Sequence, residues 1–469
     1  MPQLHGKTKF DRRIVMLGFG SIGQAVLPLL LRHIDLPPSR IEIVKPSPRG
    51  LDAAREYGVR YTAIKIDRDN LHAVLQPRLR PGDFLLNLSV DVSSKTLIEL
   101  CQERRVLYLD TCTEPWPGAY TDRSAPAEQR TNYRLREEML ALRRPGTAQA
   151  TALVTLGANP GLVSFFVKQA LLDLAGPGAH VPADRDGWAR LAQQLGVRVI
   201  HIAERDTQLG PVRKRHNEFV NTWSIDGFVS EGLQPAELGW GTHERHFPHD
   251  GARHASGCRA AIYLNRPGAG TRVRSWTPLE GPYHGFLITH AESISIADHL
   301  TVGNPEQPAY RPTVHYAYHP CDDAVLSLAE LAGRQWRRQD RTRLLRDDII
   351  EGRDELGVLL MGHAQGAYWY GSRLTVEQAR ALCPYNNATS LQVAAPIVAG
   401  VVWALDHPER GILEPDDLPH DEMLRLIKPY LGTVCGAYSG WTPLEHRESL
   451  FDEPVDRADP WQFLNFRVQ

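Results

Sequence analysis

The sequence predicts an α/β protein in which a doubly wound parallel sheet is followed by a second, α+β domain built on a mixed sheet. Three observations support this prediction. An apolar run, a glycine-rich turn and an apolar helical segment follow one another within residues 13–31. Apolar runs then alternate with helical segments up to about residue 152, which is typical of a parallel sheet. Beyond that point, runs rich in Val, Ile, Tyr and Trp follow without a regular helix between them, which indicates a mixed sheet.

The glycine-rich turn has the spacing G-x-G-x-x-G between a predicted strand at 14–17 and a helix that includes 25–31. Gly18 permits the tight turn, Gly20 lets a pyrophosphate approach the backbone, and Gly23 lets the helix pack closely on the strand. Ser21 and Ile22 open the helix, where free N–H groups attract phosphates. The pattern predicts a Rossmann-type dinucleotide-binding domain.

The residue about 20 positions beyond this motif contacts the adenosine ribose in such domains, and an acid there favours NAD. Here that position is Lys45, and Arg49 follows in the same loop. These cations would suit the 2′-phosphate of NADP, or they are simply solvated loop charges. We therefore expect NAD as the cofactor and keep NADP as an alternative.

Ligands of doubly wound sheets gather at the carboxyl ends of the strands. We expect cofactor contacts from four residues at such ends, which are Asn87, Ser89, Asp91 and Thr111. Two further polar residues, Glu114 and Asn159, lie in loops that should face the same crevice. The strands expected here are residues 14–17, 41–44, 59–64, 84–89, 106–110 and 152–156, with later helices at 69–79, 95–103 and 132–143.

Three segments are expected along the chain. Residues 1–152 form the dinucleotide-binding domain, and residues 153–385 form a substrate-binding and dimerisation domain. Residues 386–469 contain an apolar helix at 389–405 and a tail, which we expect to return to the first domain. Helices are expected at 161–175 and 185–195, and strands at 197–202, 218–223, 260–264, 286–289, 314–318, 358–361 and 368–370.

Composition limits the partners. The 53 basic and 55 acidic residues give a net charge of −2, so neither nucleic acid nor an anionic membrane is expected. The six cysteines are scattered without a C-x-x-C, which suits reduced thiols in a cytoplasm. The N-terminus lacks the apolar core of a signal peptide, and the apolar run 397–405 is too short to span a bilayer. We expect a soluble, cytoplasmic protein.

Polar residues gather in the segments 201–208, 221–224 and 230–237, where Glu204 and Glu231 bracket Trp223. If these side chains face one cavity, carboxylates and an indole face would bind a flexible cation. The alternative is a core tryptophan with solvated acids. His290 follows an apolar strand, where a general acid or base would lie, and Asp354 precedes another apolar run.

Two histidine-rich segments are candidates for a metal site. The first contains His243, His246 and His249, and the second contains His315, His319 and Cys321. Neither has a strong zinc spacing, and bulky residues interrupt both. No metal is expected.

The motifs together resemble the bacterial-type homospermidine synthases, which belong to the saccharopine dehydrogenase-like superfamily. The resemblance covers nearly the whole chain. Its most specific segments are VNTWS…EGLQPAELGWGT and YHPCDDAVLSL. The other matching motifs are GFGSIGQ, NLSVD, TCTEPW, GANPGLVSFFVKQAL, HIAERDTQ, VRSWTP, ITHAESISIADHLTV and DPWQFLN. The loop from Lys45 to Arg49 departs from the NAD pattern.

The resemblance implies a homodimer that converts two putrescines to sym-homospermidine and ammonia, with NAD as a recycled hydride carrier. It also implies the site: Trp223, Glu204, His290 and Glu231 would be catalytic, and Glu114, Asn159 and Asp354 would bind substrate. Putrescine is a dication at neutral pH, because alkyl ammonium groups have a pKa near ~10.4. One ammonium must lose a proton before its carbon is oxidised, so a base such as Glu204 or His290 is required.

Trp223 would stabilise the cationic intermediate, and a closed cavity would exclude water from it. One alternative is a net NAD(P)-dependent dehydrogenase of the saccharopine or carboxynorspermidine type. Its amino-acid substrate would require an arginine clamp, for which Arg205, Arg245, Arg272 and Arg274 are available. A second alternative is a non-enzymatic dinucleotide-binding regulator, which has no need of an acid-rich cavity.

Overall fold

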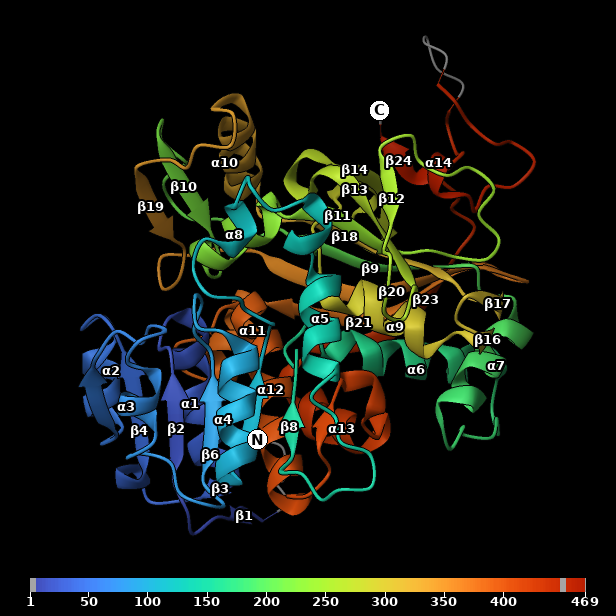
Figure 1. The fold of residues 1–469 in the computed structure, drawn as a ribbon. Coiled ribbons are helices and arrows are strands. Elements are labelled where there is room, and N and C mark those ends of the chain that lie inside the picture. The colour runs from blue at the N-terminus through green and yellow to red at the C-terminus, as the bar shows by residue number, and fades with distance from the viewer. Residues whose placement is uncertain (1–5, 448–452, 469) are drawn as a thin grey trace.

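The computed structural model describes residues 6–447 and 453–468. Two β-sheets organise the chain, and each is covered by its own helices (Figure 1). The strands of the first half of the dinucleotide-binding domain are blue at the lower left of Figure 1, and the larger second sheet occupies its upper half. The orange helices α12 (Ala388–Asp406) and α13 (His420–Ile427) return beside the first sheet.

The first sheet has seven strands, and all of its pairings are parallel, as predicted. Its inner strands are apolar and fully buried, because helices cover both faces. In spatial order the strands are β22 (Ile412–Leu413), β8 (Ala152–Leu153), β7 (Leu107–Asp110), β6 (Phe84–Asn87), β2 (Ile14–Leu17), β4 (Ile41–Lys45) and β5 (Arg60–Ala63). The helices of this half are α1 (Ser21–His33), α2 (Leu51–Glu56), α3 (Leu71–Leu75), α4 (Ser94–Arg104) and α5 (Asn132–Leu140).

The second sheet is mixed, also as predicted. It has eleven strands, of which β9 and β18 pair in parallel while the other pairings are antiparallel. The main path is β12 (Gly251–Arg253), β13 (Ala261–Pro267), β11 (Pro235–Gly239), β18 (Thr313–His319), β9 (Val199–Asp206), β20 (Arg353–His363), β21 (Gly366–Thr375) and β23 (Thr433–Ser439). The side branch is β14 (Arg272–Thr277), β15 (Gly281–Phe286) and β24 (Arg467–Val468).

Three two-stranded sheets complete the strands of the described chain. They pair β1 (Thr8–Lys9) with β3 (Ile34–Asp35), β10 (Glu218–Asn221) with β19 (Arg341–Leu344), and β16 (Val302–Asn304) with β17 (Gln307–Tyr310). The predicted strand at 286–289 ends at Phe286, and the predicted strand at 218–223 ends at Asn221.

The expectation that no regular helix lies between the strands of the second domain was wrong. Four helices lie there, namely α8 (Ile225–Leu233), α9 (Ala291–His299), α10 (Asp322–Gly333) and α11 (Val376–Leu382), in addition to the predicted α6 (Leu162–Ala175) and α7 (Arg185–Leu195). Two glycines in α8 hide its helical pattern. Ser224 nevertheless caps it by accepting the Gly227 N–H at 3.1 Å, and Phe228 is buried in the core. Burial of α8 against the core therefore outweighs the weak helix propensity of its residues.

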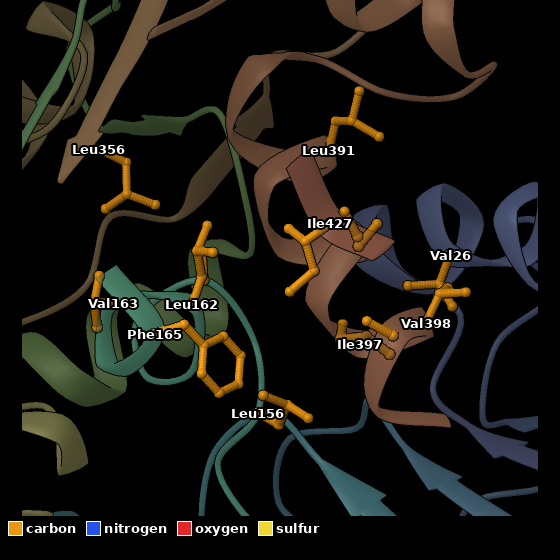
Figure 2. Close-up of a cluster of buried hydrophobic side chains, with 14 of the residues drawn as sticks. Val26, Leu156, Leu162, Val163, Phe165, Leu356, Leu391, Ile397, Val398 and Ile427 are labelled. Carbon is orange, nitrogen blue, oxygen red and sulfur yellow. The ribbon is translucent and has the colours of Figure 1, made fainter. Parts of the chain in front are cut away.

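The predicted C-terminal helix is α12, and it packs against α1 of the first domain. Within the part of the chain that is described, α12 is the one helix whose length and mean hydropathy of 1.7 would suit a membrane span. However, 89% of its most apolar window is buried inside the protein. Figure 2 shows its residues Leu391, Ile397 and Val398 among side chains of other core elements, including Val26 of α1 and Phe165 of α6.

We expect residues 386–469 to return to the first domain, but part of this segment joins the second sheet instead. β22 joins the first sheet, but β23 pairs with β21 and β24 pairs with β14 in the second sheet. An unpaired sheet edge exposes a row of N–H and C=O groups, and β23 satisfies those of β21. The described part of the final segment also includes the short helix α14 (Phe463–Phe466).

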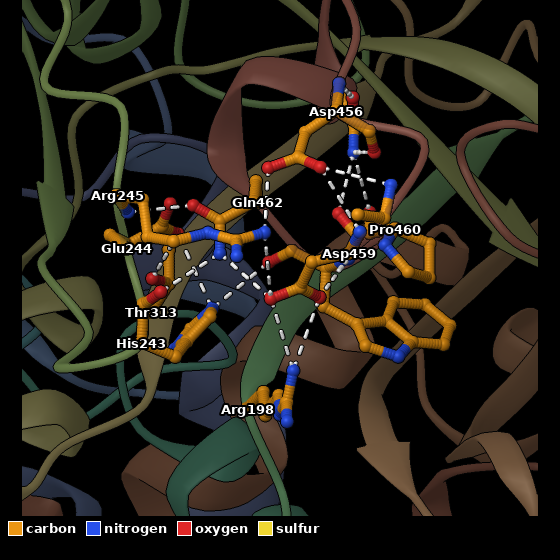
Figure 3. Close-up of polar contacts among 12 residues, drawn as sticks. Arg198, His243, Glu244, Arg245, Thr313, Asp456, Asp459, Pro460 and Gln462 are labelled. Carbon is orange, nitrogen blue, oxygen red and sulfur yellow. Dashed lines mark hydrogen bonds and ion pairs between the residues drawn. The ribbon is translucent and has the colours of Figure 1, made fainter.

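A polar cluster fixes this final segment to the second sheet (Figure 3). Arg198 donates to Asp459 at 3.1 Å, and Arg245 donates to Asp456 at 2.7 Å. His243 contacts the Trp461 carbonyl at 2.9 Å, so the first histidine-rich segment serves packing. Within residues 6–447 and 453–468, no group of three or more His, Cys, Asp or Glu side chains is arranged to hold a metal ion.

A buried arginine joins the two domains. Arg136 of α5 donates to both carboxylate oxygens of Glu414, at 2.6 and 2.7 Å, and to Asp298 of α9 at 2.9 Å. The Arg136 side chain is 5% exposed, so the buried Glu414 carboxylate depends on this guanidinium for charge neutralisation, while Asp298 also pairs with Arg185 at 2.6 Å. Arg134, two residues earlier on α5, pairs with Glu138 on the surface.

Replacing Arg136 should therefore destabilise the protein strongly. We expect Arg136→Ala to lower the free energy of unfolding by about 3–5 kcal/mol, because it removes the charged partner of the buried Glu414 and one of the two arginines that pair with Asp298. Arg134→Ala on the same helix is the control and should cost about 0.5 kcal/mol or less. Urea unfolding of both variants measures this difference. If Arg136→Ala and Arg134→Ala unfold at the same urea concentration, Arg136 does not hold the domains together.

Candidate active site

The glycine-rich turn has the geometry that the sequence predicts for nucleotide binding. Gly18 has a φ of +82°, and a Cβ there would lie 2.4 Å from the Leu88 carbonyl oxygen. A Cβ at Gly23 would lie 3.0 Å from the Gly18 oxygen, so this position holds the helix close to the turn. A Cβ at Gly20 would meet nothing within 4 Å, which leaves open space beside the backbone. No side chain caps α1, so its first N–H groups are available to a phosphate.

Lys45 has a role that neither of our interpretations included. Its ammonium donates to the Phe19 carbonyl at 3.1 Å and to the Arg49 carbonyl at 2.9 Å. Lys45 therefore connects the glycine turn to the loop after β4. Burial, followed by the nearby Arg49 and Arg346 charges, lowers the pKa of Lys45.

The other predicted cofactor residues lie at the carboxyl ends of β6 and β7. Ser89 and Thr111 line the central cavity together with Ile22. Asn87 instead holds the loop, because its side-chain oxygen accepts the Ser89 hydroxyl at 2.6 Å. Asp91 is exposed and has a φ of +65°.

A cavity of about 120 Å³ lies between the two domains, at the carboxyl edge of the first sheet. Six of the seven predicted substrate-site residues line it: Glu114, Asn159, Glu204, Trp223, Glu231 and His290. Its lining contains neither lysine nor arginine. The cavity is therefore acidic and is bounded on one side by residues from the predicted nucleotide site.

Glu204 lies on β9 and is buried in the cavity wall. One carboxylate oxygen accepts the Asn159 amide at 2.7 Å and the Tyr316 hydroxyl. Burial raises the pKa of Glu204 to about 7, and these two hydrogen bonds oppose that rise. The group therefore changes charge near neutral pH, as a general base requires.

His290 immediately precedes α9 and lies between two acids. Its Nε2 is 3.2 Å from Glu231 and its Nδ1 is 3.2 Å from Glu292. Burial alone would lower the pKa of His290, but the Glu292 and Glu231 charges outweigh it and raise the pKa to about 10. His290 is consequently an imidazolium at neutral pH.

Trp223 follows β10 and is partly buried, with its ring at the cavity. Its indole N–H donates to the Tyr318 hydroxyl at 3.1 Å. Phe228 of α8 lies 5.3 Å from the Trp223 ring, between ring centroids. The indole is thus held by one hydrogen bond and one aromatic contact while it faces the cavity.

Glu114 follows β7 and is held at the cavity by its backbone. Ser94 accepts the Glu114 N–H at 3.0 Å and returns its own N–H to the Glu114 carbonyl at 2.8 Å. Burial, followed by the Glu231 charge, raises the pKa of Glu114 to about 8. The Cys112 thiol lies beside this carboxylate, and burial raises the pKa of the thiol.

Asp354, the seventh predicted residue, lies behind the cavity wall. Thr389, which lines the cavity, donates to Asp354 at 2.7 Å, while the other Asp354 oxygen has no hydrogen-bond partner in the described structure. Burial raises the pKa of Asp354, and the charges of Glu204 and Asp206 raise it further. Asp354 therefore belongs to a buried carboxylate cluster and has no direct place in the lining.

Not all of the predicted polar constellation faces this cavity. Because side chains alternate along β9, His201 points to the opposite side of the sheet and bonds Ser275 at 3.0 Å. Glu237 accepts the N–H groups of Asn132 and Tyr133 at the start of α5, and the Thr289 hydroxyl. Of the three predicted segments, the residues that line this cavity are Glu204, Trp223, Ser224 and Glu231.

Thr389 and Tyr316 line the cavity although neither is among the predicted site residues, and nor is Tyr318, which accepts the Trp223 N–H. The segment HYAYH carried a usable signal, because residues two apart in a strand share a face. No sequence pattern indicates Thr389, because its position depends on how the start of α12 packs against the second domain.

Comparison with known proteins identifies the two halves. Residues 14–153 match the family described as saccharopine dehydrogenase NADP binding domain, and residues 157–436 match the saccharopine dehydrogenase C-terminal domain. The fold also resembles apo saccharopine dehydrogenase from Saccharomyces cerevisiae, with a TM-score of 0.51, 11% identity, and coverage of 92% of this chain and 100% of that one.

Three relatives are much closer. The chain is 52% identical to the homospermidine synthase of Blastochloris viridis, over 98% of both chains, and 49% identical to that of Mesorhizobium japonicum, over 97% of this chain and 96% of the other. It is 50% identical to the crystallised homospermidine synthase of Legionella pneumophila in complex with NAD, with a TM-score of 0.92 and 99% of both chains covered. By fold, by domain content and by sequence, the chain belongs to the homospermidine synthase family of enzymes.

Proposed function

We propose that this protein converts two putrescine molecules to sym-homospermidine and ammonia, with NAD as a recycled hydride carrier and no net oxidation. The observation that carries the proposal is the acidic cavity beside the glycine turn. Glu114, Glu204 and Glu231 line it together with the Trp223 ring, and lysine and arginine are absent from its lining. Such a lining complements a small dication better than it complements an amino acid.

NAD fits the residues of the first domain. The open space at Gly20 and the uncapped start of α1 would receive its pyrophosphate, and Ile22, Ser89 and Thr111 lie between that turn and the cavity. When bound, the nicotinamide supplies a hydride acceptor that later becomes a donor. The relative from Legionella pneumophila was crystallised with NAD, which supports the same cofactor here.

Binding comes first. A primary ammonium group can pair with Glu114 or Glu231, and the remote end of the diamine is then anchored. A bound cation favours the ionised carboxylate, so Glu114, whose pKa is about 8, would release its proton as substrate arrives.

Proton removal is then assigned to Glu204. The base must be unprotonated, and His290 is protonated at neutral pH because Glu292 and Glu231 flank it. Glu204, with a pKa of about 7, is the group that can take a proton from the reacting ammonium. His290 would instead donate a proton, which suits the departure of ammonia after the second amine attacks the imine carbon.

Trp223 would stabilise the charged imine. Trp223 lines the cavity and its N–H donates to Tyr318, so the indole is held beside the space that a substrate would occupy. The enclosed cavity between the domains would keep water from hydrolysing the imine before the second diamine reacts.

The rival dehydrogenase requires a carboxylate clamp. Its candidate arginines are engaged elsewhere: Arg205 lies near Asp322 and Glu280, Arg245 near Asp456, Arg272 over the Phe286 ring, and Arg274 near Glu453. This arrangement supports the synthase. By family resemblance we also propose a cytoplasmic homodimer.

A product assay tests redox neutrality. Incubation with putrescine and NAD should accumulate homospermidine and ammonia in equal amounts, while NADH absorbance stays at or below the enzyme concentration. The acidic cavity beside one nucleotide site motivates this expectation. NADH formed in proportion to the putrescine consumed would instead establish a net dehydrogenase.

The pH profile tests Glu204. If ionised Glu204 is the base, kcat/KM should fall as the pH drops through about 7, the folded-state pKa of Glu204. Glu204→Gln should remove this acidic limb of the pH profile and lower kcat by roughly 100-fold or more. Glu244→Gln is the control, because Glu244 is also buried with a pKa of about 7 but lies in the polar cluster of Figure 3. An acidic limb that persists in Glu204→Gln, or that is lost in Glu244→Gln, would refute the assignment.

A substitution series tests Trp223. A desolvated cation–π contact is worth about 2 kcal/mol, so Trp223→Ala should slow turnover by roughly 30-fold or more. Trp223→Phe keeps a weaker π face and should retain intermediate activity. Trp188→Phe, in α7 and outside the cavity lining, controls for loss of a buried indole. Turnover that is equal in all folded variants, with only the melting temperature lowered, would make Trp223 structural.

A further inference from the structure

Two tyrosines on β18 connect the groups assigned to the chemistry. Tyr316 and Tyr318 are two residues apart and share a face of the strand, where their rings stack at 5.1 Å with an angle of 5°. Both are almost fully buried, at 2% and 1% exposure. The Tyr316 hydroxyl donates to Glu204, and the Tyr318 hydroxyl accepts the Trp223 indole N–H at 3.1 Å.

The stack extends in both directions. The His290 ring lies 4.6 Å from the Tyr316 ring, between centroids, and Phe228 lies 5.7 Å from Tyr318 and 5.3 Å from Trp223. β18 also pairs in parallel with β9, where Tyr318 lies opposite Glu204. One short strand therefore contacts the base, the imidazolium and the indole, which come from three other segments of the chain.

We propose that Tyr316 and Tyr318 are positioning residues that hold Glu204 and Trp223 in fixed register, so that base and indole act on the same amine-bearing carbon. This inference rests on the proposed function, because it takes the roles of Glu204 and Trp223 from it. A rigid pair suits the task, since packed aromatic rings keep their hydroxyls in place at little cost in side-chain entropy, and small misplacements of reacting groups slow catalysis.

Tyr316 has a second effect, on the basicity of Glu204. A hydrogen bond to a carboxylate favours its charged form, so the Tyr316 hydroxyl lowers the pKa of Glu204 against the effect of burial. The other groups around Glu204 are its amide donor Asn159, the acids Asp206 and Asp354, the imidazolium His290, and the phenols Tyr283 and Tyr318. Tyr316→Phe changes none of these groups directly.

The experiment compares pH profiles of kcat/KM for holoenzyme carrying Tyr316→Phe, Tyr318→Phe or Tyr310→Phe. Tyr316→Phe should move the acidic limb to higher pH and lower kcat/KM at pH 7 by roughly tenfold, the worth of one hydrogen bond to a charged group. Tyr318→Phe should lower kcat without moving the limb, because it loses only the bond to Trp223. Tyr310→Phe loses a buried bond to the Val197 carbonyl and should change stability alone.

Replacing Tyr316 with 3-fluorotyrosine provides a second test that keeps the shape of the ring. The more acidic phenol donates more strongly, so the limb should move to lower pH, opposite to Tyr316→Phe. If the acidic limb of the kcat/KM profile lies at the wild-type pH in both Tyr316 variants, the proposal is overturned and the two tyrosines are structural. Failure of wild-type enzyme to make homospermidine would refute the proposed function instead, so the two failures are distinguishable.

Discussion

Burial of carboxylates in the cavity between the two domains is the constraint on which the rest of the site depends. Glu114 and Glu204 have pKa values of about 8 and 7 because the cavity walls remove the water that would stabilise their charges. A diamine dication replaces that missing stabilisation. The same enclosure strengthens each electrostatic contact with a charged intermediate and excludes the water that would hydrolyse an imine. Substrate affinity and protection of the intermediate therefore have one physical origin.

This enclosure depends on how the domains are joined. The cavity wall is assembled from the carboxyl edge of the first sheet, from β9 and β18 of the second, and from the start of α12. Arg136 neutralises Glu414 and Asp298 from the two sides of the junction. The core that includes α12, α6 and α1 continues across it (Figure 2). A rigid junction keeps acids from separate domains within reach of one small substrate.

Much of the fold could be predicted, and the misses have identifiable causes. The parallel sheet, the mixed sheet and the packing of α12 on α1 follow from periodicity and from burial on both faces. α8 was missed because its glycines weaken the helical pattern while tertiary packing secures it. The pairing of β23 with β21 joins segments about 60 residues apart, and no local pattern specifies such a partner.

The sequence by itself determined the glycine turn, the acidic character of the site and most of the polar residues that line it, because motif spacing and residue type are local properties. Only the tertiary structure decided what each residue can do. By sequence, His290 and Glu204 are equal candidates for the base, whereas in the fold Glu231 and Glu292 lie on either side of the imidazole. Protonation depends on burial and on neighbouring charges, and both are set by segments that are distant in sequence and adjacent only in the fold.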